Sequence, residues 1–281
     1  MADFSQFDQR PSLIGSRFDL RAQKNEHITP EQEHKFLKEG VWGFIHSEET
    51  GSAVDGPGMR VVFWTSGCDF RCLYCHNPDT WKLKYGQLVS VEIILEELKK
   101  YENFLKLAGG GLTISGGEPL VQYKFVMNIL RGAKNMGIHT ALDTNGFFGN
   151  RLTDEDMEAI DLFLLDIKSW DPQTHLRVTA QPVKPVLDFA GRLAQLKKPI
   201  WLRYVLVPGL TDAPDNVDGV AAFAAGLGNV QKVEVLPFHQ LGKFKWKELG
   251  MKYELDDTQT PSREETKVAK DIFRAHGLNV S

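Results

Sequence analysis

The chain's three cysteines all lie in one short stretch, at Cys68, Cys72 and Cys75. This C-x3-C-x2-C spacing lets three thiolates close round one metal centre, and soft sulfur favours an iron-sulfur cluster, zinc or copper(I) over magnesium or calcium. A closed zinc site needs four ligands, and His76, next to Cys75, is badly placed to be the fourth. A four-iron cluster normally takes four cysteines, so three would leave one iron open for chemistry.

Two other interpretations of these cysteines stay open. Free cysteine is among the most buried residue types, so the three thiols could be purely structural. A zinc-binding module is the second, and it would bind zinc without carrying out a reaction. Because every thiol of the chain is gathered at metal-ligand spacing, a metal site is the favoured interpretation.

Composition limits the partners and the compartment. The 33 Lys and Arg against 37 Asp and Glu give a net charge of -4 without a long basic run, so we expect no nucleic-acid partner. No apolar stretch is long enough to span a membrane, and the polar first residues do not look like a secretory signal. We expect a cytoplasmic protein, because thiolate ligands need a reducing compartment.

The elements that position the cysteines follow from the local sequence. Residues 1–40 are expected to be an N-terminal extension, partly disordered, with one short helix after the capping-box residue Thr29. Residues 41–281 form the main domain. In it, a β-rich run at 60–64 leads directly into the cysteines, and a buried strand at 112–115 leads into two glycines, which let a ligand approach the backbone closely.

The rest of the chain repeats a strand followed by a helix. One helix is predicted after the N-cap Ser90, ending at the glycines 109–111, and later strands are predicted at 138–142, 162–167, 200–207 and 233–236. Six such units predict an α/β fold with a parallel sheet and right-handed crossovers, arranged as a partial (βα)6 barrel. Ligands gather at the carboxyl ends of such strands. We expect polar or ligand-type residues there at Cys68, Gly117, Asp143, Asp166, Lys168, Arg203 and His239.

Two of these motifs resemble those of radical S-adenosylmethionine enzymes. The first is C-x3-C-x2-C with an aromatic residue, Tyr74, before the last cysteine, and the second is G-G-E-P at 116–119. The V-D-G-P-G-M-R stretch at 54–60 resembles the start of glycyl-radical-enzyme activases in particular. The resemblance continues toward the end of the chain through four further motifs, D-T-N-G, L-D-I-K, R-Y-V-x-V-P-G and L-P-F-H-x-L-G-K.

The resemblance implies an activity and partners. In this family a reduced four-iron, four-sulfur cluster cleaves S-adenosylmethionine, and the 5′-deoxyadenosyl radical takes a hydrogen atom from a glycine Cα of a protein. The chain has no cysteine-rich insert, which favours the branch acting on pyruvate formate-lyase. A flavodoxin or ferredoxin would supply the electron, and we expect a monomer. The alternatives are another glycyl radical enzyme as the partner, or a small-molecule substrate.

The resemblance also implies roles for individual residues. Asp55 would lie on the loop that meets the protein substrate. The cluster would be held by Cys68, Cys72 and Cys75. S-adenosylmethionine would contact Tyr74, Cys75, His76, Gly117, Glu118, Asp143, Asp166, Ile167, Lys168 and His239. A monovalent cation would lie beside Asp143, Thr144 and Asp166.

Overall fold

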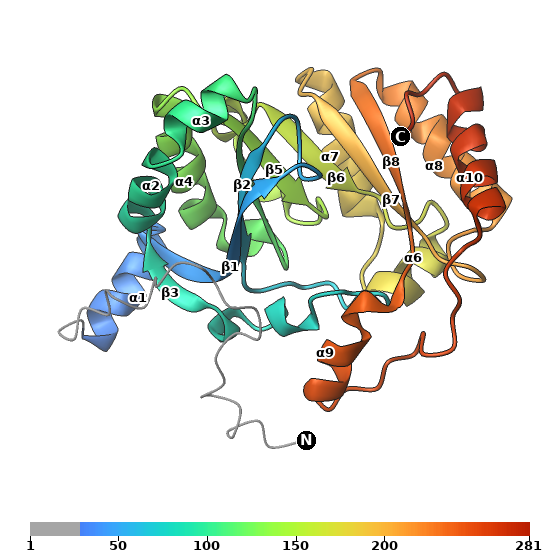
Figure 1. The fold of residues 1–281 in the computed structure, drawn as a ribbon, viewed down its shortest axis with the longest axis horizontal. Coiled ribbons are helices and arrows are strands. Elements are labelled where there is room, and N and C mark those ends of the chain that lie inside the picture. Colours follow the sequence, from blue (N-terminus) through green and yellow to red (C-terminus); the bar gives the residue numbers. More distant parts are fainter. Residues whose placement is uncertain (1–28) are drawn as a thin grey trace. The chain divides into compact units, whose positions relative to one another are not determined.

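The computed structural model describes residues 29–281, which fall into two compact units (Figure 1). Unit 1 contains the described residues up to Cys68 together with 80–139, and unit 2 contains 69–79 and 140–281. The expectation of disorder in the N-terminal extension concerns mainly residues 1–28, which lie outside the described residues. The boundary between the units therefore falls inside the cysteine stretch.

Unit 1 contains four strands in the order β3-β1-β2-β4. Their bounds are β1 (Trp42–Ser52), β2 (Arg60–Thr65), β3 (Gln87–Ser90) and β4 (Gly111–Gly116). β1 pairs antiparallel with both β2 and β3, whereas β2 and β4 pair in parallel. Val61, Val62 and Phe63 of β2 are all buried, as expected for a strand that is covered on both faces.

Four helices accompany these strands: α1 (Pro30–Glu39), α2 (Val91–Lys99), α3 (Glu102–Leu107) and α4 (Tyr123–Asn135). The capping box predicted at Thr29 is confirmed. The single helix predicted between Ser90 and the glycines 109–111 is wrong, because the chain forms α2 and α3 instead. The N–H groups of Lys100 and Tyr101 bond three residues back, to Glu97 and Leu98, and this tight turn interrupts the α-helical ladder.

Unit 2 contains parallel strands in the order β5-β6-β7-β8. They are β5 (His139–Thr144), β6 (Leu162–Asp166), β7 (Ile200–Leu206) and β8 (Val230–Pro237). The helices are α5 (Asp154–Glu158), α6 (Pro172–Thr179), α7 (Lys184–Gln195), α8 (Pro214–Leu227), α9 (Lys243–Glu248) and α10 (Arg263–Ala275). Figure 1 shows α8 and α10 side by side next to β8. β3, α6 and α9 had not been predicted.

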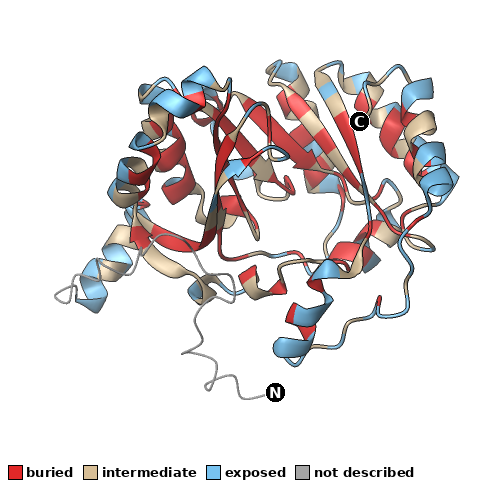
Figure 2. Cartoon of the chain, in the orientation of Figure 1, coloured by how far each residue is buried: buried red, intermediate tan, exposed pale blue. Residues whose placement is uncertain are grey.

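Burial follows the strands in both units. Figure 2 shows the strands largely in the buried colour, while the outward faces of the helices are exposed. Along the chain β2, β4, β5, β6, β7 and β8 give six successive βα steps. The predicted class, α/β with a partial (βα)6 barrel, is confirmed. Among residues 29–281, no helix is long and apolar enough to cross a membrane.

Candidate active site

Cys68 and Gly117 meet just after two paired strands of unit 1. β2 and β4 run parallel, so the segments that follow them leave the same edge of the sheet. The N–H of Glu118 donates to the carbonyl oxygen of Gly67 at 2.8 Å. A Cβ on Gly117 would lie 2.6 Å from that oxygen and 3.0 Å from the Cβ of Cys68. This close approach of the two backbones requires a glycine at 117.

Glu118 has a structural partner of its own. The residue is fully buried, and its carboxylate accepts a hydrogen bond from the N–H of Leu120 at 2.9 Å. It thereby caps a short 3-10 helix, Pro119–Gln122. A capping carboxylate holds the segment after β4 in one conformation, and the role of Glu118 toward a cofactor stays a prediction.

The remainder of the cysteine loop belongs to unit 2 and rests against α6. The N–H of Leu73 donates to the carbonyl of Val178 at 3.0 Å. A tight turn then brings Cys72 and Cys75 close together, because the N–H of Cys75 donates to the carbonyl of Cys72 at 3.0 Å. Two of the three cysteines therefore have a fixed backbone relation within one unit.

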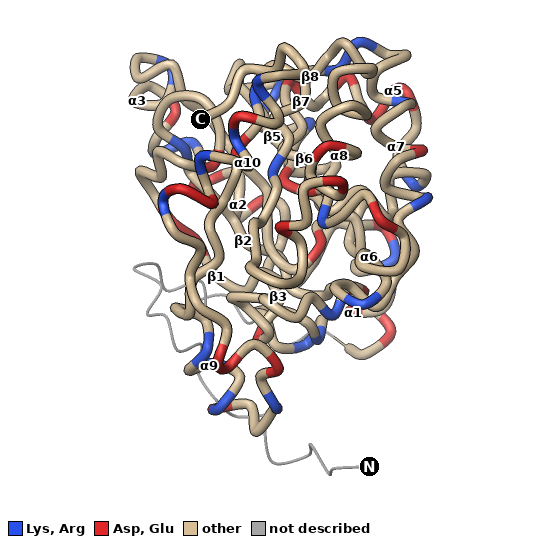
Figure 3. Tube along the Cα trace, turned by 90° about the vertical axis from the view of Figure 1, so that its right-hand side faces the viewer, with Lys and Arg blue, Asp and Glu red and all other residues tan. Residues whose placement is uncertain are grey.

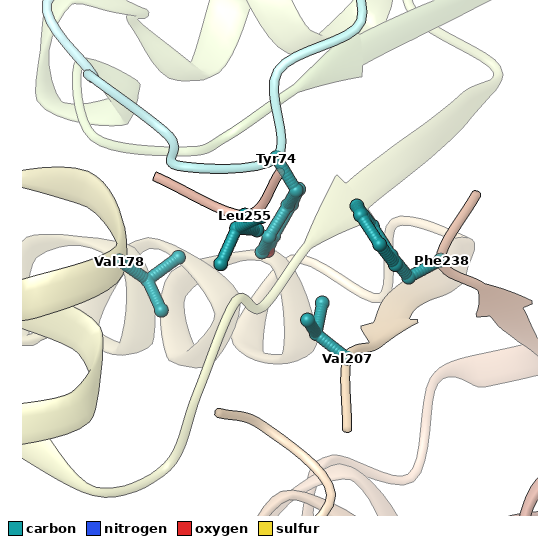
Figure 4. Packing of buried hydrophobic residues seen from close by; sticks show 5 residues of the cluster. All are labelled: Tyr74, Val178, Val207, Phe238 and Leu255. Atoms are coloured by element: carbon teal, nitrogen blue, oxygen red, sulfur yellow. The ribbon is translucent and has the colours of Figure 1, made fainter. Parts of the chain in front are cut away.

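An apolar cluster supports this part of the loop. In Figure 4 five side chains point toward one another, with the ring of Tyr74 packed among them: Tyr74, Val178, Val207, Phe238 and Leu255. The hydroxyl of Tyr74 is buried and has no hydrogen-bond partner among residues 29–281. Burial raises the pKa of this hydroxyl well above its ordinary value. A buried polar atom without a partner is costly, so this hydroxyl is available to a ligand.

Lys168 and Asp166, which flank the end of β6, form a largely buried ion pair. The Lys168 Nζ lies 2.8 Å from an Asp166 carboxylate oxygen, and the two side chains are 12% and 20% exposed. Burial acts to lower the pKa of Lys168, but the charges of Asp166 and Cys72 outweigh it, and the pKa is raised. Lys168 is therefore protonated and offers a positive charge beside the cysteine loop.

The thiol of Cys72 is poorly suited to ionise alone. Burial raises its pKa to about 12, although the charge of Lys168 acts in the opposite direction. A metal ion that takes the place of the proton would bind such a thiolate.

Ile167 lies between Asp166 and Lys168 in the sequence and is fully buried. Its N–H donates to the carbonyl of Arg203 at 3.2 Å. Its predicted contact with a cofactor is untested.

The imidazole rings of His76 and His239 are in contact, inclined by 34° to each other. Their ring centroids are 4.2 Å apart, and His76 Nε2 lies 3.2 Å from the carbonyl oxygen of His239. Burial, followed by the charge of His239, lowers the pKa of His76. The Nδ1 of His239 is buried and has no hydrogen-bond partner in the described part of the chain. Like the Tyr74 hydroxyl, this nitrogen points to a polar ligand that the protein alone does not supply.

Arg203 departs from the sequence prediction. It was expected at the carboxyl end of a strand, but it lies in the middle of β7. Its guanidinium bridges Asp143 at 3.1 Å and Glu234 at 3.0 Å. β7 alternates buried and half-buried residues, so a polar residue at this position faces the neighbouring strands' carboxylates. Asp143 is thus engaged with Arg203.

Thr144 is buried at the end of β5, and its hydroxyl accepts a hydrogen bond from the N–H of Gly146 at 3.0 Å. The hydroxyl fixes the turn after the strand. The monovalent cation predicted beside Asp143, Thr144 and Asp166 is untested. These three residues contact Arg203, the N–H of Gly146 and Lys168, respectively.

Asp55 lies in unit 1, in the turn between β1 and β2. Its carboxylate accepts a hydrogen bond from the hydroxyl of Ser52 at 2.6 Å, and its backbone carbonyl accepts one from the hydroxyl of Thr113 at 2.6 Å. Thr113 in turn accepts from the fully buried Arg60 at 3.0 Å. The turn that carries Asp55 is therefore firmly held.

Two residues in contact with the cysteine loop were not predicted, Lys245 and Trp246 of α9. The indole Nε1 of Trp246 donates to the carbonyl of Cys75 at 2.8 Å, and Lys245 pairs with Asp79 at 2.9 Å. In the sequence, Lys245 is one of three lysines, with Lys243 and Lys247, that alternate with aromatic or other residues after Leu241. Figure 3 shows residues of both charge signs interleaved around α9. The residues next to Lys245 in the sequence do not indicate that its side chain is buried.

The residues of unit 2 fit a charged organic ligand near the cysteine loop. Among residues 29–281, no group of three or more His, Cys, Asp or Glu side chains has the arrangement of a protein-only metal site. Unit 2 nevertheless places a protonated lysine, two imidazoles in contact and two unpartnered polar atoms next to Cys72 and Cys75. These groups can bind a carboxylate and a flat heterocycle.

The comparison with protein families defines the class. Residues 62–217, more than half of the chain, match the radical SAM superfamily. The protein is a radical SAM enzyme, a class that uses an iron-sulfur cluster together with S-adenosylmethionine. The chain is also 44% identical, over 234 residues, to a pyruvate formate-lyase-activating enzyme of Staphylococcus aureus (strain USA300), covering 81% of this chain and 93% of that protein. The chain therefore belongs to the family of pyruvate formate-lyase-activating enzymes.

Solved structures agree with this family. A crystal structure of a domain of pyruvate-formate lyase-activating enzyme from Bacteroides vulgatus ATCC 8482 is 28% identical, with a TM-score of 0.50, and the match covers 61% of this chain and 98% of that one. Streptococcus suis SuiB bound to S-adenosylmethionine has a TM-score of 0.59 at 15% identity, covering 88% of this chain and 52% of that one. The second likeness concerns the fold alone.

Proposed function

We propose that this protein activates a pyruvate formate-lyase by forming a glycyl radical on it. The observation that carries the proposal is the 44% identity to an activating enzyme across 93% of that protein's length. The chain that matches this relative over 234 residues also has the features expected of the site. These are the cysteine stretch, G-G-E-P and the polar ends of β5, β6 and β8.

The proposed cluster ligands are Cys68, Cys72 and Cys75, with one iron left for the cofactor. When bound, the cluster supplies one electron for reductive cleavage of S-adenosylmethionine, and the 5′-deoxyadenosyl radical then removes a hydrogen atom from a glycine Cα. The protein's part is to bind, orient and shield the reacting groups. The hydrogen bond from the N–H of Cys75 to the carbonyl of Cys72 at 3.0 Å, which holds two of these cysteines close together, supports a shared metal centre.

The proposed S-adenosylmethionine site uses charges and rings already in place. Lys168, protonated beside Asp166, would bind the carboxylate of the methionine moiety through a charge-assisted hydrogen bond. The unpartnered Nδ1 of His239 would bind the same carboxylate. Tyr74 and His76 would border the adenine, and the backbone of Gly117 would accept from the ammonium group.

The remaining cofactor contacts and partners come from the family resemblance. Glu118, Asp143, Asp166 and Ile167 would complete the cofactor site, and a monovalent cation beside Asp143, Thr144 and Asp166 would offset neighbouring carboxylates. A flavodoxin or ferredoxin would supply the electron. We further propose a monomer that works in the cytoplasm, where cysteine ligands remain reduced.

The test of the proposal uses two readouts from one anaerobic reaction. The protein is reconstituted with iron and sulfide, reduced, and incubated with S-adenosylmethionine and a pyruvate formate-lyase. We expect 5′-deoxyadenosine by chromatography and a glycyl-radical doublet on the partner by electron paramagnetic resonance. Cleavage without a doublet would point to another glycyl radical enzyme or a small-molecule substrate. Stoichiometric zinc without iron uptake would show a zinc-binding module instead.

The contact with the protein substrate is assigned to the turn that carries Asp55. Hydrogen bonds from Ser52 and Thr113 hold this turn, and no step of cofactor binding needs its carboxylate. The Asp55→Ala variant should keep nearly all S-adenosylmethionine cleavage in the absence of the partner while lowering radical transfer about tenfold, the effect of one lost charge-assisted contact. Glu49→Ala, an exposed acid on β1, serves as the control. An equal fall of both signals in Asp55→Ala would contradict the docking role.

A further inference from the structure

Residues 240–248, a 3-10 turn followed by α9, press against the last part of the cysteine loop within unit 2. The indole N–H of Trp246 donates to the carbonyl of Cys75 at 2.8 Å. The residue after Cys75 is contacted as well, because a Cβ on Gly242 would lie 2.6 Å from the Cα of His76. Gly242 therefore brings the backbone of the turn into direct contact with the loop, immediately beside the hydrogen bond from Trp246.

Lys245 binds two residues that lie further along the same loop, Asn77 and Asp79. Its Nζ donates to Asn77 Oδ1 at 2.8 Å and lies 2.9 and 3.1 Å from the two carboxylate oxygens of Asp79. The lysine side chain is 5% exposed and that of Asp79 is 16% exposed. An ammonium has three N–H donors, and each has an acceptor in the loop. A buried lysine that is paired in this way ties the segment down, because releasing it would leave a charge uncompensated.

The contacts reach Cys75, His76, Asn77 and Asp79 in turn, yet they come from one short segment more than 160 residues away in the sequence. We propose that Lys245 and Trp246 are positioning residues that hold Cys75 in its ligand geometry before a metal binds. This inference rests on the proposed function, in which Cys75 is a cluster ligand. We call Gly242, Lys245 and Trp246 the loop clamp.

The physical reason is the cost of ordering a loop. A free loop must lose backbone entropy when its cysteines bind a metal. The loop clamp removes part of that cost, because the carbonyl of Cys75 is already bound and the residues after it are tied by Lys245. Residues that orient metal ligands in this way typically change metal affinity by about 10- to 100-fold when they are replaced.

Three variants of the full-length chain test this inference. Trp246→Phe keeps an aromatic ring beside Tyr253, whose ring centroid lies 5.2 Å away, and removes the N–H donor together with one of the two fused rings. Lys245→Met removes the ammonium. Lys243→Met, on the same helix, removes the partly exposed ion pair with Asp256 and leaves the cysteine loop untouched, so it is the matched control.

The first measurement is the rate at which EDTA removes iron from the anaerobically reconstituted protein. We expect about tenfold faster release from Trp246→Phe and Lys245→Met, with Lys243→Met within about twofold of the parent. The second is amide hydrogen exchange in the metal-free chain. We expect residues 75–79 to exchange faster in the first two variants and unchanged in the control.

The two measurements separate this inference from the proposed function. If the parent takes up no iron-sulfur cluster, the proposed function fails, and faster exchange at 75–79 in Trp246→Phe still decides whether the clamp orders the loop. If Lys245→Met does not fold, Trp246→Phe alone decides. Parent-like exchange together with parent-like iron release in a folded Trp246→Phe variant would overturn the inference.

Discussion

The imidazole of His239 lies against that of His76, with 4.2 Å between the ring centroids, yet its own Nδ1 has no hydrogen-bond partner among residues 29–281. The tilted ring contact fixes the His239 ring, and the carbonyl of His239 contacts His76 Nε2 at 3.2 Å. The ring is therefore held by its face and its backbone, while one nitrogen is left for a ligand. This combination separates the packing role of His239 from its binding role.

His239→Phe should consequently impair binding without harming the fold. Phenylalanine keeps the ring contact and the backbone carbonyl but removes the nitrogen. A hydrogen bond to a charged group contributes about 1.5–3 kcal/mol, so calorimetry should show S-adenosylmethionine binding at least about tenfold weaker. The melting temperature should be unchanged or slightly raised. His276→Gln, which changes the exposed pair with Asp218, should bind like the parent. Unchanged affinity of His239→Phe would remove His239 from the site.

Lys168→Met should weaken binding and stability together. The ammonium lies 2.8 Å from Asp166, in a pair that is mostly buried, and its loss leaves that carboxylate uncompensated. We expect S-adenosylmethionine binding to lose about 2 kcal/mol, and the free energy of unfolding to fall by about 3 kcal/mol. Lys184→Met, which breaks an exposed pair with Asp188, should change neither by more than about 0.5 kcal/mol. Calorimetry and urea unfolding report the two quantities, and parent-like affinity in a folded Lys168→Met variant would rule out the proposed contact.

Gly117→Ala should disturb the cluster loop itself. The added Cβ would lie 2.6 Å from the carbonyl oxygen of Gly67 and 3.0 Å from the Cβ of Cys68, so the segment that carries the first cysteine must shift. We expect iron bound per chain after reconstitution to fall severalfold. Gly191→Ala in α7, where an added Cβ meets nothing within 4 Å, should instead stabilise the protein by roughly 0.5–1 kcal/mol. Full iron loading of Gly117→Ala would show that the loop tolerates the shift.

Local sequence signals found the parts of the site that follow strands. The apolar run of β2 leads to Cys68, that of β4 leads to Gly117, and the capping box at Thr29 marks α1. Each signal is contained within a few neighbouring residues, so it can be interpreted without knowing what lies across the fold. The alternation of β7 also contained a signal for Arg203, since the residue falls at a half-buried position of the strand, but it was assigned to the strand's end.

Long-range partners were not accessible in the same way. Lys245 looks like one of several solvated lysines because its partner Asp79 lies 166 residues earlier in the chain. The helix that carries it has no side-chain cap and only six residues, too short for a periodic apolar pattern to stand out. α6 offered a better signal, the Asp171 cap before a proline. A buried ion pair becomes visible only when the fold brings its members together.

Glu48 of β1 gives the protein a pH-dependent stability. Its carboxylate oxygens have no hydrogen-bond partner among residues 29–281. Burial, and then the nearby Glu97, raise the pKa of Glu48 from 4.5 to about 7, while Lys100, already paired with Glu97 at 2.5 Å, acts in the opposite direction. The folded protein binds this proton more tightly than the unfolded chain does. Below pH 4.5 the raised pKa of Glu48 therefore leaves the free energy of unfolding unchanged. As the pH rises, the free energy of unfolding is lowered increasingly, until the pH exceeds about 7.

Glu48→Gln should accordingly stabilise the protein at high pH and have little effect at low pH. Both carboxylate oxygens are buried, but the residue as a whole is only half-buried. Nearby solvent therefore reduces the penalty, and we expect a gain of about 1 kcal/mol at pH 8 that shrinks toward pH 5. Urea unfolding of the metal-free chain at both pH values measures the difference. Glu49→Gln, at the exposed neighbouring position on β1, should show no such dependence on pH. A Glu48→Gln gain that is the same at both pH values would mean that the carboxylate's charge is not what destabilises the strand.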